Sequence, residues 1–110
     1  MEILVYGKHE IYDRFLLDTL SELGISTFYT QSYFEMFNKA TKGGDMLIVS
    51  GTYFVEEDGV YSAEKIIELF KATRKVVYIG TQPEKHHQAD LALSRVSDLG
   101  KTAEQIKKLL

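Results

Sequence analysis

The sequence predicts a single α/β domain in which a parallel sheet of four or five strands lies between two layers of helices, a three-layer, doubly wound arrangement. Short runs rich in branched and aromatic residues alternate with segments whose apolar residues recur at helical spacing, which is the pattern of βαβ units. A chain of 110 residues can enclose one core but not two. Its 45% hydrophobic and 26% charged residues are typical of a globular protein, so residues 1–110 are expected to form one domain.

The first quarter of the chain predicts a strand, a helix and a second strand. A run of branched and aromatic residues at 3–6 is expected to form the first strand. The helix after it carries an apolar stripe at helical spacing, and Gly24 is placed to end that helix. The stripe consists of Tyr12, Leu16, Leu20 and Leu23. A second strand is expected at residues 25–29.

The next helix is expected to begin at a capping box. Ser32 and Glu35 stand three residues apart, so the serine oxygen and the glutamate should each satisfy a free amide of the first turn. The buried side of this helix is expected to consist of Tyr33, Met36, Phe37 and Ala40. Gly43 and Gly44 break the helix before a continuous apolar run at residues 46–49. Such a run is typical of a strand covered on both faces, so it predicts the central strand.

A polar loop, a helix and a strand are expected next. Residues 56–59 are three carboxylates and a glycine, which predicts a polar turn. Ser62 is the expected N-cap of a helix that buries four apolar residues. These are Ala63, Ile66, Ile67 and Phe70. Residues 76–79 are then expected to form a fourth strand.

The last third of the chain leaves one element open. Residues 91–96 could be a fifth strand, or Ala89, Leu93 and Val96 could be one face of a helix, and we favour the strand. Residues 102–105 fit a capping box, so a closing helix is expected to begin there. Its apolar side would consist of Ala103, Ile106 and Leu110.

Parallel strands bring the loops that follow them to one edge of the sheet. Strands joined by crossover helices run in parallel because that connection is right-handed, and ligands of such sheets bind beyond the carboxyl ends of the strands. Here that edge collects residues 7–10, 30–32, 50–58 and 81–87. The residues expected to meet a ligand or a partner at this edge are Gly7, Ser50, Thr52, Tyr53 and Thr81.

Several segments resemble one known family in their apolar spacing. They are residues 2–5 with the helix that ends at 20–24, the run at 45–49 and the terminal segment at 102–110. In order, they resemble the opening strand, first helix, third strand and last helix of the receiver domain of bacterial response regulators. The resemblance covers nearly the whole chain, and it implies a flavodoxin-like fold and a role in signalling.

The chain departs from this family where the chemistry of the family resides. Receiver domains hold magnesium with paired acidic residues after the first strand, where this chain has Tyr6 and Gly7, neither of which supplies a side-chain carboxylate. Ser50 stands in place of the phosphoaccepting aspartate, and no acyl phosphate can form on it. Thr81 matches the family's hydroxyl residue, and Arg95 stands where a lysine is expected. The segment between these two is shorter than in the family, so the family's fourth helix is not assured.

The resemblance and its departures together predict a pseudo-receiver. We expect a non-catalytic regulatory or signalling module that binds a protein partner or a second copy of itself, without phosphotransfer. No catalytic residue, cofactor or metal ligand is assigned. This expectation about function rests on an analogy of fold.

The alternative is a flavodoxin-like protein that binds a flavin or a nucleotide at the loops after the strands. Residues 50–54 are similar to the loop that flavodoxins place against the flavin ring, with Tyr53 as the stacking residue. Flavodoxins also begin with a loop rich in serine, threonine and glycine that cradles the phosphate, and residues 7–11 do not supply it. Otherwise Tyr53 is expected to cover the sheet edge or to meet a partner.

Other chemistries lack the residues that they need. The absence of cysteine excludes disulfides, thiolate metal sites and the nucleophile of sugar-transport phosphotransfer components of similar size. Three histidines, His9, His86 and His87, fall at the same edge as the carboxylates of residues 56–58, but we expect them to be solvated loop residues. Ser50 lacks the G-x-S-x-G elbow of a hydrolase nucleophile.

Charge and hydropathy restrict the partners. A net charge of −3 gives no general attraction to phosphate backbones, so nucleic acid is not an expected partner. No apolar run approaches the roughly 20 residues of a membrane span, so no membrane contact is expected either. The N-terminus has no charged leader, which predicts a cytoplasmic protein.

Overall fold

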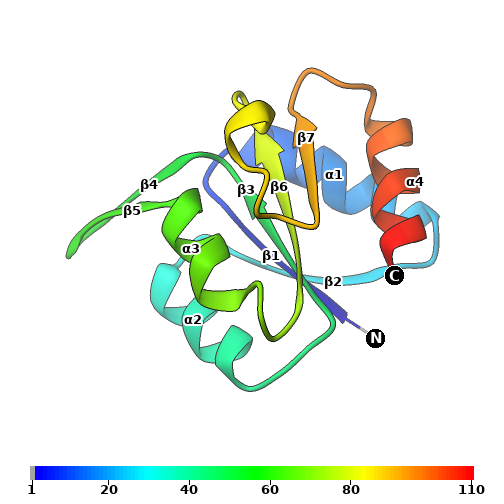
Figure 1. Ribbon diagram of the computed structural model, residues 1–110. Coiled ribbons are helices and arrows are strands. Elements are labelled where there is room, and N and C mark those ends of the chain that lie inside the picture. The colour runs from blue at the N-terminus through cyan, green and yellow to red at the C-terminus, as the bar shows by residue number, and fades with distance from the viewer. Residues whose placement is uncertain (1) are drawn as a thin grey trace.

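The computed structural model describes residues 2–110 and contains a five-stranded parallel sheet (Figure 1). Its strands are β1 (Glu2–Gly7), β2 (Ser26–Thr30), β3 (Met46–Ser50), β6 (Lys75–Gly80) and β7 (Leu91–Ser94). Their spatial order is β2-β1-β3-β6-β7, and each neighbouring pair runs in parallel. The predicted three-layer, doubly wound α/β class is confirmed, with five strands in the sheet.

Two helices cover each face of the sheet. On one face lie α1 (Glu10–Glu22) and α4 (Leu99–Leu109), whose apolar sides pack around Leu16, Leu20 and Ile106. On the other face lie α2 (Tyr33–Thr41) and α3 (Ala63–Phe70), which bury Met36 and Phe70 among others. The chain reverses its direction of winding between β1 and β3, so the carboxyl ends of these two strands form the switch point of the sheet.

The central strand is the one that the sequence predicts. All five residues of β3 are buried, and the strand lies between β1 and β6. Its last residue, Ser50, is in register with Gly7 at the end of β1. This pairing places the ends of both strands side by side at the switch point.

Two predicted helix starts and two breaks are confirmed. Ser32 and Ser62 cap α2 and α3, and their side-chain oxygens accept from the amides of Glu35 and Lys65 at 3.2 Å. After α1 and α2 the chain turns at Gly24 and at the pair Gly43 and Gly44, all with positive φ, a conformation that other residues rarely adopt.

Two details of helix capping were predicted wrongly. The amide of Ser32 is satisfied by the hydroxyl of Thr30 at 3.0 Å, so the reciprocal bond from Glu35 is not needed. The closing helix begins earlier than residue 102, because Asp98 caps α4 by accepting from the amide of Gly100 at 2.8 Å. Thr102 is therefore a buried residue within the helix.

The buried sides of two helices also differ in part from the prediction. In α2, Met36 and Ala40 are buried as predicted, but Tyr33 is half-buried and Phe37 is 37% exposed. Leu110, predicted on the apolar side of the closing helix, lies past its end and is also partly exposed. The rings that α2 leaves uncovered line a groove described below.

Residues 56–59 form the predicted polar turn, but this turn is the tip of a β-hairpin rather than part of a loop that leads to a helix. β4 (Tyr53–Glu56) and β5 (Gly59–Ser62) pair in antiparallel fashion, with Val55 opposite Val60. Figure 1 shows the hairpin projecting from the carboxyl edge of the sheet. The sequence signal was a short polar segment with a glycine between two runs of branched and aromatic residues, which is typical of hairpins. The two turn residues are Glu57 and Asp58, and Gly59 begins β5 opposite Glu56.

The segment after β6 resolves the element that the sequence left open. It contains a single 3-10 turn, η1 (Pro83–Lys85), and then β7, so residues 91–94 are a strand as favoured. In the described chain no α-helix lies between β6 and β7, so the receiver family's fourth helix is missing. Within residues 2–110, none of the helices has both the length and the apolar character needed to cross a membrane.

Candidate functional site

Three polar side chains meet at the switch point of the sheet. Asp13 projects from the buried side of α1 and is fully buried. The Oγ of Ser50 donates to Oδ1 of Asp13 at 2.5 Å, and the hydroxyl of Tyr29 donates to Oδ2 at 2.8 Å. The same Tyr29 hydroxyl lies 3.1 Å from the carbonyl oxygen of Gly7. The end of each of three neighbouring strands thus contributes to one cluster.

Gly7 is the residue that lets Asp13 reach Ser50. A Cβ atom at position 7 would lie 2.3 Å from Oδ2 of Asp13 and 2.9 Å from the Cβ of Ser50. These distances are far below van der Waals contact, so any side chain here would displace the carboxylate. The predicted site residues Gly7 and Ser50 are therefore brought together, and the gap between them is filled by an aspartate from a helix.

The pKa of Asp13 reflects its burial, which is partly offset by hydrogen bonds and nearby positive charge. Burial raises the pKa of the Asp13 carboxyl above its ordinary value, while the hydrogen bonds from Ser50 and Tyr29 and the charge of Arg95 oppose this rise. Arg95 follows β7, and its guanidinium carbon lies 5.5 Å from the centre of the Tyr12 ring. A Cβ on Gly51 would be 3.7 Å from this guanidinium, so Arg95 borders the cluster.

The other predicted edge residues do not join this cluster. The hydroxyl of Thr52 pairs with that of Tyr78 at 2.7 Å, on the opposite side of the sheet from α1. Tyr53 lies on β4 and is 71% exposed. Thr81 lies just after β6 and is exposed. Only two of the five predicted residues therefore meet each other.

Asp13 and Tyr29 were missed by the sequence reasoning, although one signal was present. Asp13 stands three and seven residues before Leu16 and Leu20, so it lies on the apolar stripe of α1. A carboxylate on a buried helix face needs partners, and this is a reason to single it out. Tyr29 belongs to no sequence motif. Its contact with Asp13 depends on the pairing of β2 with β1, which the local sequence does not show.

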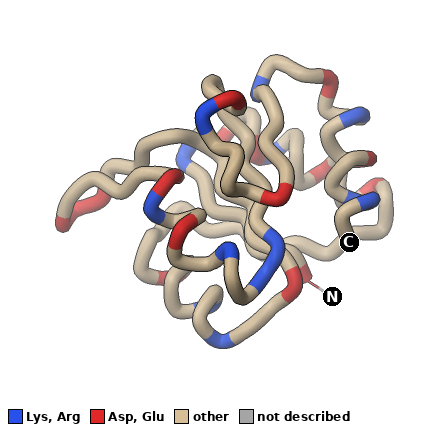
Figure 2. The backbone as a smooth tube through the Cα atoms, viewed as in Figure 1, with Lys and Arg blue, Asp and Glu red and all other residues tan. Residues whose placement is uncertain are grey.

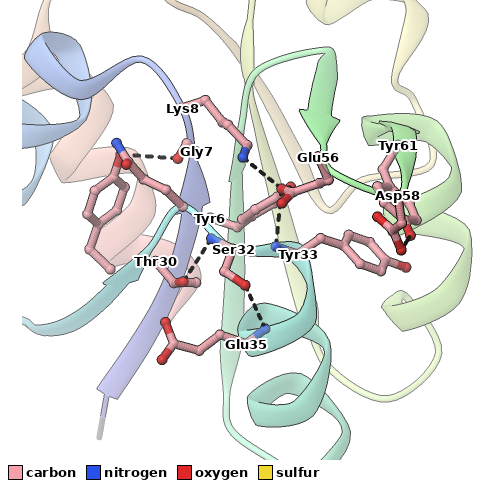
Figure 3. A network of polar contacts seen from close by, with 12 residues as sticks. Tyr6, Gly7, Lys8, Thr30, Ser32, Tyr33, Glu35, Glu56, Asp58 and Tyr61 are labelled. Carbon is pink, nitrogen blue, oxygen red and sulfur yellow. Dashed lines mark hydrogen bonds and ion pairs between the residues drawn. The ribbon is translucent and has the colours of Figure 1, made fainter.

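A second network joins the hairpin to β1 and α2 (Figure 3). Oε2 of Glu56 accepts from the hydroxyl of Tyr6 at 2.6 Å and from the amide of Tyr33 at 3.2 Å, and it pairs with Nζ of Lys8 at 2.9 Å. Burial alone would raise the pKa of Glu56, but the hydrogen bonds from Lys8 and Tyr6 outweigh burial and hold that pKa below its ordinary value. Tyr6, where the receiver family has an acidic residue, is thus a fully buried anchor for the hairpin.

The histidines and the acidic tip do not assemble a metal site. Within residues 2–110, no group of three or more histidine and carboxylate side chains is placed to hold a metal ion. His86 differs from the prediction, because it is buried and stacks on Tyr78 with the ring centres 4.0 Å apart. Burial lowers the pKa of His86. His87 is exposed, as predicted for a solvated loop residue. His9 is also exposed, but it differs from the prediction because its Nδ1 caps α1 by accepting from the amide of Tyr12 at 3.3 Å.

The strand order and the meeting of β1 and β3 at the switch point define the fold of receiver domains, a flavodoxin-like α/β fold. Among solved structures, the chain is similar to the receiver domain of the hybrid histidine kinase CckA. This likeness has a TM-score of 0.77 and 16% identity, and it covers 100% of this chain and 99% of that chain. The predicted resemblance to receiver domains is confirmed at the level of the fold.

A second solved structure gives the same result. The chain is similar to HP1043, an orphan response regulator of H. pylori, with a TM-score of 0.76 and 16% identity over 100% of this chain and 96% of that chain. No protein-family model matches the sequence, and no curated protein matches it. At such identity, the shared property is the fold of these signalling domains, and the chemistry has to be argued from the residues of this chain.

Proposed function

We propose that this protein is a regulatory module of pseudo-receiver type, which binds a protein partner and carries out neither phosphotransfer nor any other turnover. The observation that carries the proposal is the hydrogen bond from Ser50 to Asp13 at the end of β3. In the receiver family, the residue at this position is the aspartate that accepts the phosphoryl group. Here a serine hydroxyl occupies the position and is already bonded to a buried carboxylate.

The cluster is also poorly suited to magnesium. Mg²⁺ prefers octahedral oxygen coordination, commonly with one or two carboxylates that remain free to bind it. Asp13 is the carboxylate of this cluster, and its two oxygens accept from Ser50 and Tyr29. A magnesium ion would compete with both hydrogen bonds for the carboxylate oxygens, and the neighbouring Arg95 would repel it. This arrangement supports a structural role for Asp13.

The buried carboxylate also argues against the flavin or nucleotide alternative. A bound phosphate at the end of β1 would approach Gly7, where Oδ2 of Asp13 already fills the space. The phosphate and the Asp13 carboxylate would then be two anions in close contact, and like charges repel each other strongly in a buried site. A protein partner therefore fits this edge better than a phosphorylated cofactor.

Exposed apolar side chains support the binding of a protein. Val55 and Val60 face each other across the hairpin and are 72% and 64% exposed, and the neighbouring Tyr53 is also exposed. Apolar side chains gathered on one projecting element are typical of interaction surfaces. The net charge of −3 disfavours nucleic acid as the partner. We also propose that the protein is cytoplasmic.

Incubation with acetyl phosphate and magnesium, followed by intact mass measurement, tests the proposal. We expect no phosphoryl adduct on the wild-type chain and a colourless protein without bound nucleotide. An adduct that forms only with magnesium would overturn the proposal, and so would a flavin or nucleotide that co-purifies with the protein. A receiver domain that has its aspartate is the positive control.

A further inference from the structure

A groove lies between the first turns of α2 and the β4–β5 hairpin. Its volume is about 710 Å³. The rings that line it are those of Tyr33, Phe34 and Phe37 from α2 and of Tyr61 from β5. The turn of the hairpin adds the carboxylates of Glu57 and Asp58. The groove thus combines aromatic surface with negative charge.

The aromatic wall is built from rings that hold one another in place. Tyr33 and Tyr61 stack with their centres 3.7 Å apart and their planes within 9°, and Phe37 stacks on Tyr33 at 6.0 Å. Figure 3 shows the stacked tyrosines beside Asp58. Phe34, at 76% exposed, offers most of its ring to the solvent. A ligand would therefore meet a wall that is already ordered.

The charges that line the groove have one sign. The charge of Glu56 is already neutralised by Lys8. The carboxylate of Glu57 is exposed, and that of Asp58 accepts a hydrogen bond from the Tyr61 hydroxyl at 2.8 Å through one oxygen. The bond to Asp58 raises the pKa of the Tyr61 hydroxyl, as expected beside a carboxylate. Figure 2 shows acidic residues at the tip of the hairpin. The groove is therefore electronegative and attracts cations.

We propose that this groove binds an arginine-containing basic segment of a protein partner. A guanidinium can stack on the exposed aromatic surface and donate to the carboxylates of Glu57 and Asp58 at the same time. Lysine has no planar face to stack, so arginine fits the combination of aromatic surface and carboxylates better. This inference rests on the proposed protein-binding function and names the chemistry of the partner.

The size and the sign of the groove favour a peptide segment over other ligands. A volume of about 710 Å³ lies within the usual range for ligand pockets and can hold more than one side chain. Nucleic acid would be repelled by Glu57 and Asp58, because phosphates carry the same sign of charge. The groove lies between a helix and a hairpin and is open to solvent, so a segment of a partner can reach its aromatic wall.

Binding of a short fluorescent peptide with several arginines tests the proposal. The matched control peptide has citrulline in place of each arginine, which keeps the shape of the side chain and removes its charge. We expect the citrulline peptide to bind about tenfold more weakly, since an exposed charge pair and a cation–π contact each contribute up to roughly 1 kcal/mol. Binding of the arginine peptide should also weaken as salt rises, because exposed charges are screened.

Substitutions of groove residues test whether the arginine peptide binds at the groove. Glu57→Gln combined with Asp58→Asn should weaken binding of the arginine peptide about five- to tenfold, and Phe34→Ala should weaken it a few-fold. Glu104→Gln on α4 removes an exposed carboxylate outside the groove and should leave binding unchanged. Circular dichroism checks that each variant is folded, which is expected because the altered side chains are exposed.

The outcomes separate this inference from the proposed function. Equal binding of the two peptides, or equal effects of the groove variants and Glu104→Gln, would overturn the basic-segment proposal. The acetyl phosphate experiment reads a different property, so the pseudo-receiver proposal would stand if no adduct formed. A magnesium-dependent adduct together with arginine-specific binding at the groove would overturn the proposed function and leave the binding site in place.

Discussion

The hydroxyl of Ser50 donates a hydrogen bond to the carboxylate of Asp13, which joins the end of the central strand to the buried side of α1. A receiver domain uses this place for an aspartate that faces a magnesium ion. Here the carboxylate comes from a helix, and its partners are two hydroxyl groups of the same chain. The Asp13 carboxylate and the hydroxyls of Ser50 and Tyr29 therefore satisfy one another, which favours a structural role for this cluster.

Asp13→Ala should destabilise the protein. The substitution removes the acceptor of both the Ser50 and the Tyr29 hydroxyls and leaves a cavity where the carboxylate was. The expected loss of unfolding free energy is about 2–4 kcal/mol, because the buried Ser50 donor left without a partner costs about 1–3 kcal/mol and the cavity adds to that loss. The half-buried Tyr29 hydroxyl keeps the carbonyl oxygen of Gly7 as an acceptor. Urea denaturation measures the loss. Asp18→Ala, at an exposed position of the same helix, should change the stability by less than about 0.5 kcal/mol. Equal effects of the two variants would contradict the role of Asp13.

The comparison of wild type with Asp13→Asn should depend on pH. Because burial raises the pKa of Asp13, its contribution to stability is fully present below the ordinary pKa of 3.8 and is lost as the pH rises through the folded-state pKa. Asparagine does not titrate. The unfolding free energy of wild type relative to Asp13→Asn should therefore be greatest in acid and should fall toward neutral pH. Urea denaturation at a series of pH values measures this difference, and a rise with pH would show that hydrogen bonds outweigh burial.

Gly7→Ala tests the close approach of β1, β3 and α1. The new Cβ would lie 2.3 Å from Oδ2 of Asp13, so the carboxylate has to move away from Ser50. Overpacking of this kind costs about 1–3 kcal/mol. Gly7→Ala made in the Asp13→Ala background should cost clearly less, because the atom that clashes is gone. Thermal denaturation of the four proteins gives this cycle, and additive effects would mean that the clash is relieved elsewhere.

The sequence predicted most of the fold because the sheet and the helix faces follow simple patterns. The buried run of β3, the stripe of α1 and the caps at Ser32 and Ser62 each depend on residues close together in the chain. The hairpin was missed because its acidic turn was interpreted as a loop, although a short polar segment with a glycine lies between two runs of branched and aromatic residues. The cap of α4 was misplaced because Asp98 offers an earlier oxygen.

The candidate site was harder to predict, because its contacts join residues far apart in the sequence. Gly7 and Ser50 could be placed at one edge from strand order alone. The partner that fills the space between them, Asp13, comes from a helix, and its orientation depends on how α1 packs against the sheet. The Glu56 network likewise depends on the hairpin folding back toward β1 and α2. Motif spacing carries no information on such contacts.

Glu56→Gln should weaken the attachment of the hairpin and reduce the sensitivity to acid. The side chain is 15% exposed and accepts from Tyr6 and the amide of Tyr33, so the loss is expected to be about 1–2 kcal/mol. Lys8 is more exposed, so screening keeps its share small. Because the pKa of Glu56 is lowered, its contribution is present above the ordinary value of 4.5 and is lost as the pH falls through the folded-state pKa.

Urea denaturation at several pH values measures this effect of Glu56. The unfolding free energy of wild type should fall more steeply below pH 4.5 than that of Glu56→Gln. Glu57→Gln is the matched control, because its carboxylate is exposed on the same hairpin. It should leave the stability and its pH dependence nearly unchanged. A control as destabilised as Glu56→Gln would mean that the charge of the hairpin, and not the network, matters.

Ser50→Asp should convert the cluster into a site that responds to magnesium. The new carboxylate would lie beside that of Asp13, within the distance now spanned by one hydrogen bond. Two buried like charges repel, so the variant should be less stable than wild type at neutral pH and should recover part of the loss in acid. Two adjacent carboxylates are also ligands that Mg²⁺ prefers. Millimolar Mg²⁺ should therefore raise the melting temperature of Ser50→Asp and leave that of wild type unchanged.

Ser50→Asn has nearly the same shape without the charge and should not respond to the ion. A wild-type protein stabilised by Mg²⁺ as much as the aspartate variant would mean that Asp13 already binds the ion, and the pocket would then keep part of the chemistry of a receiver.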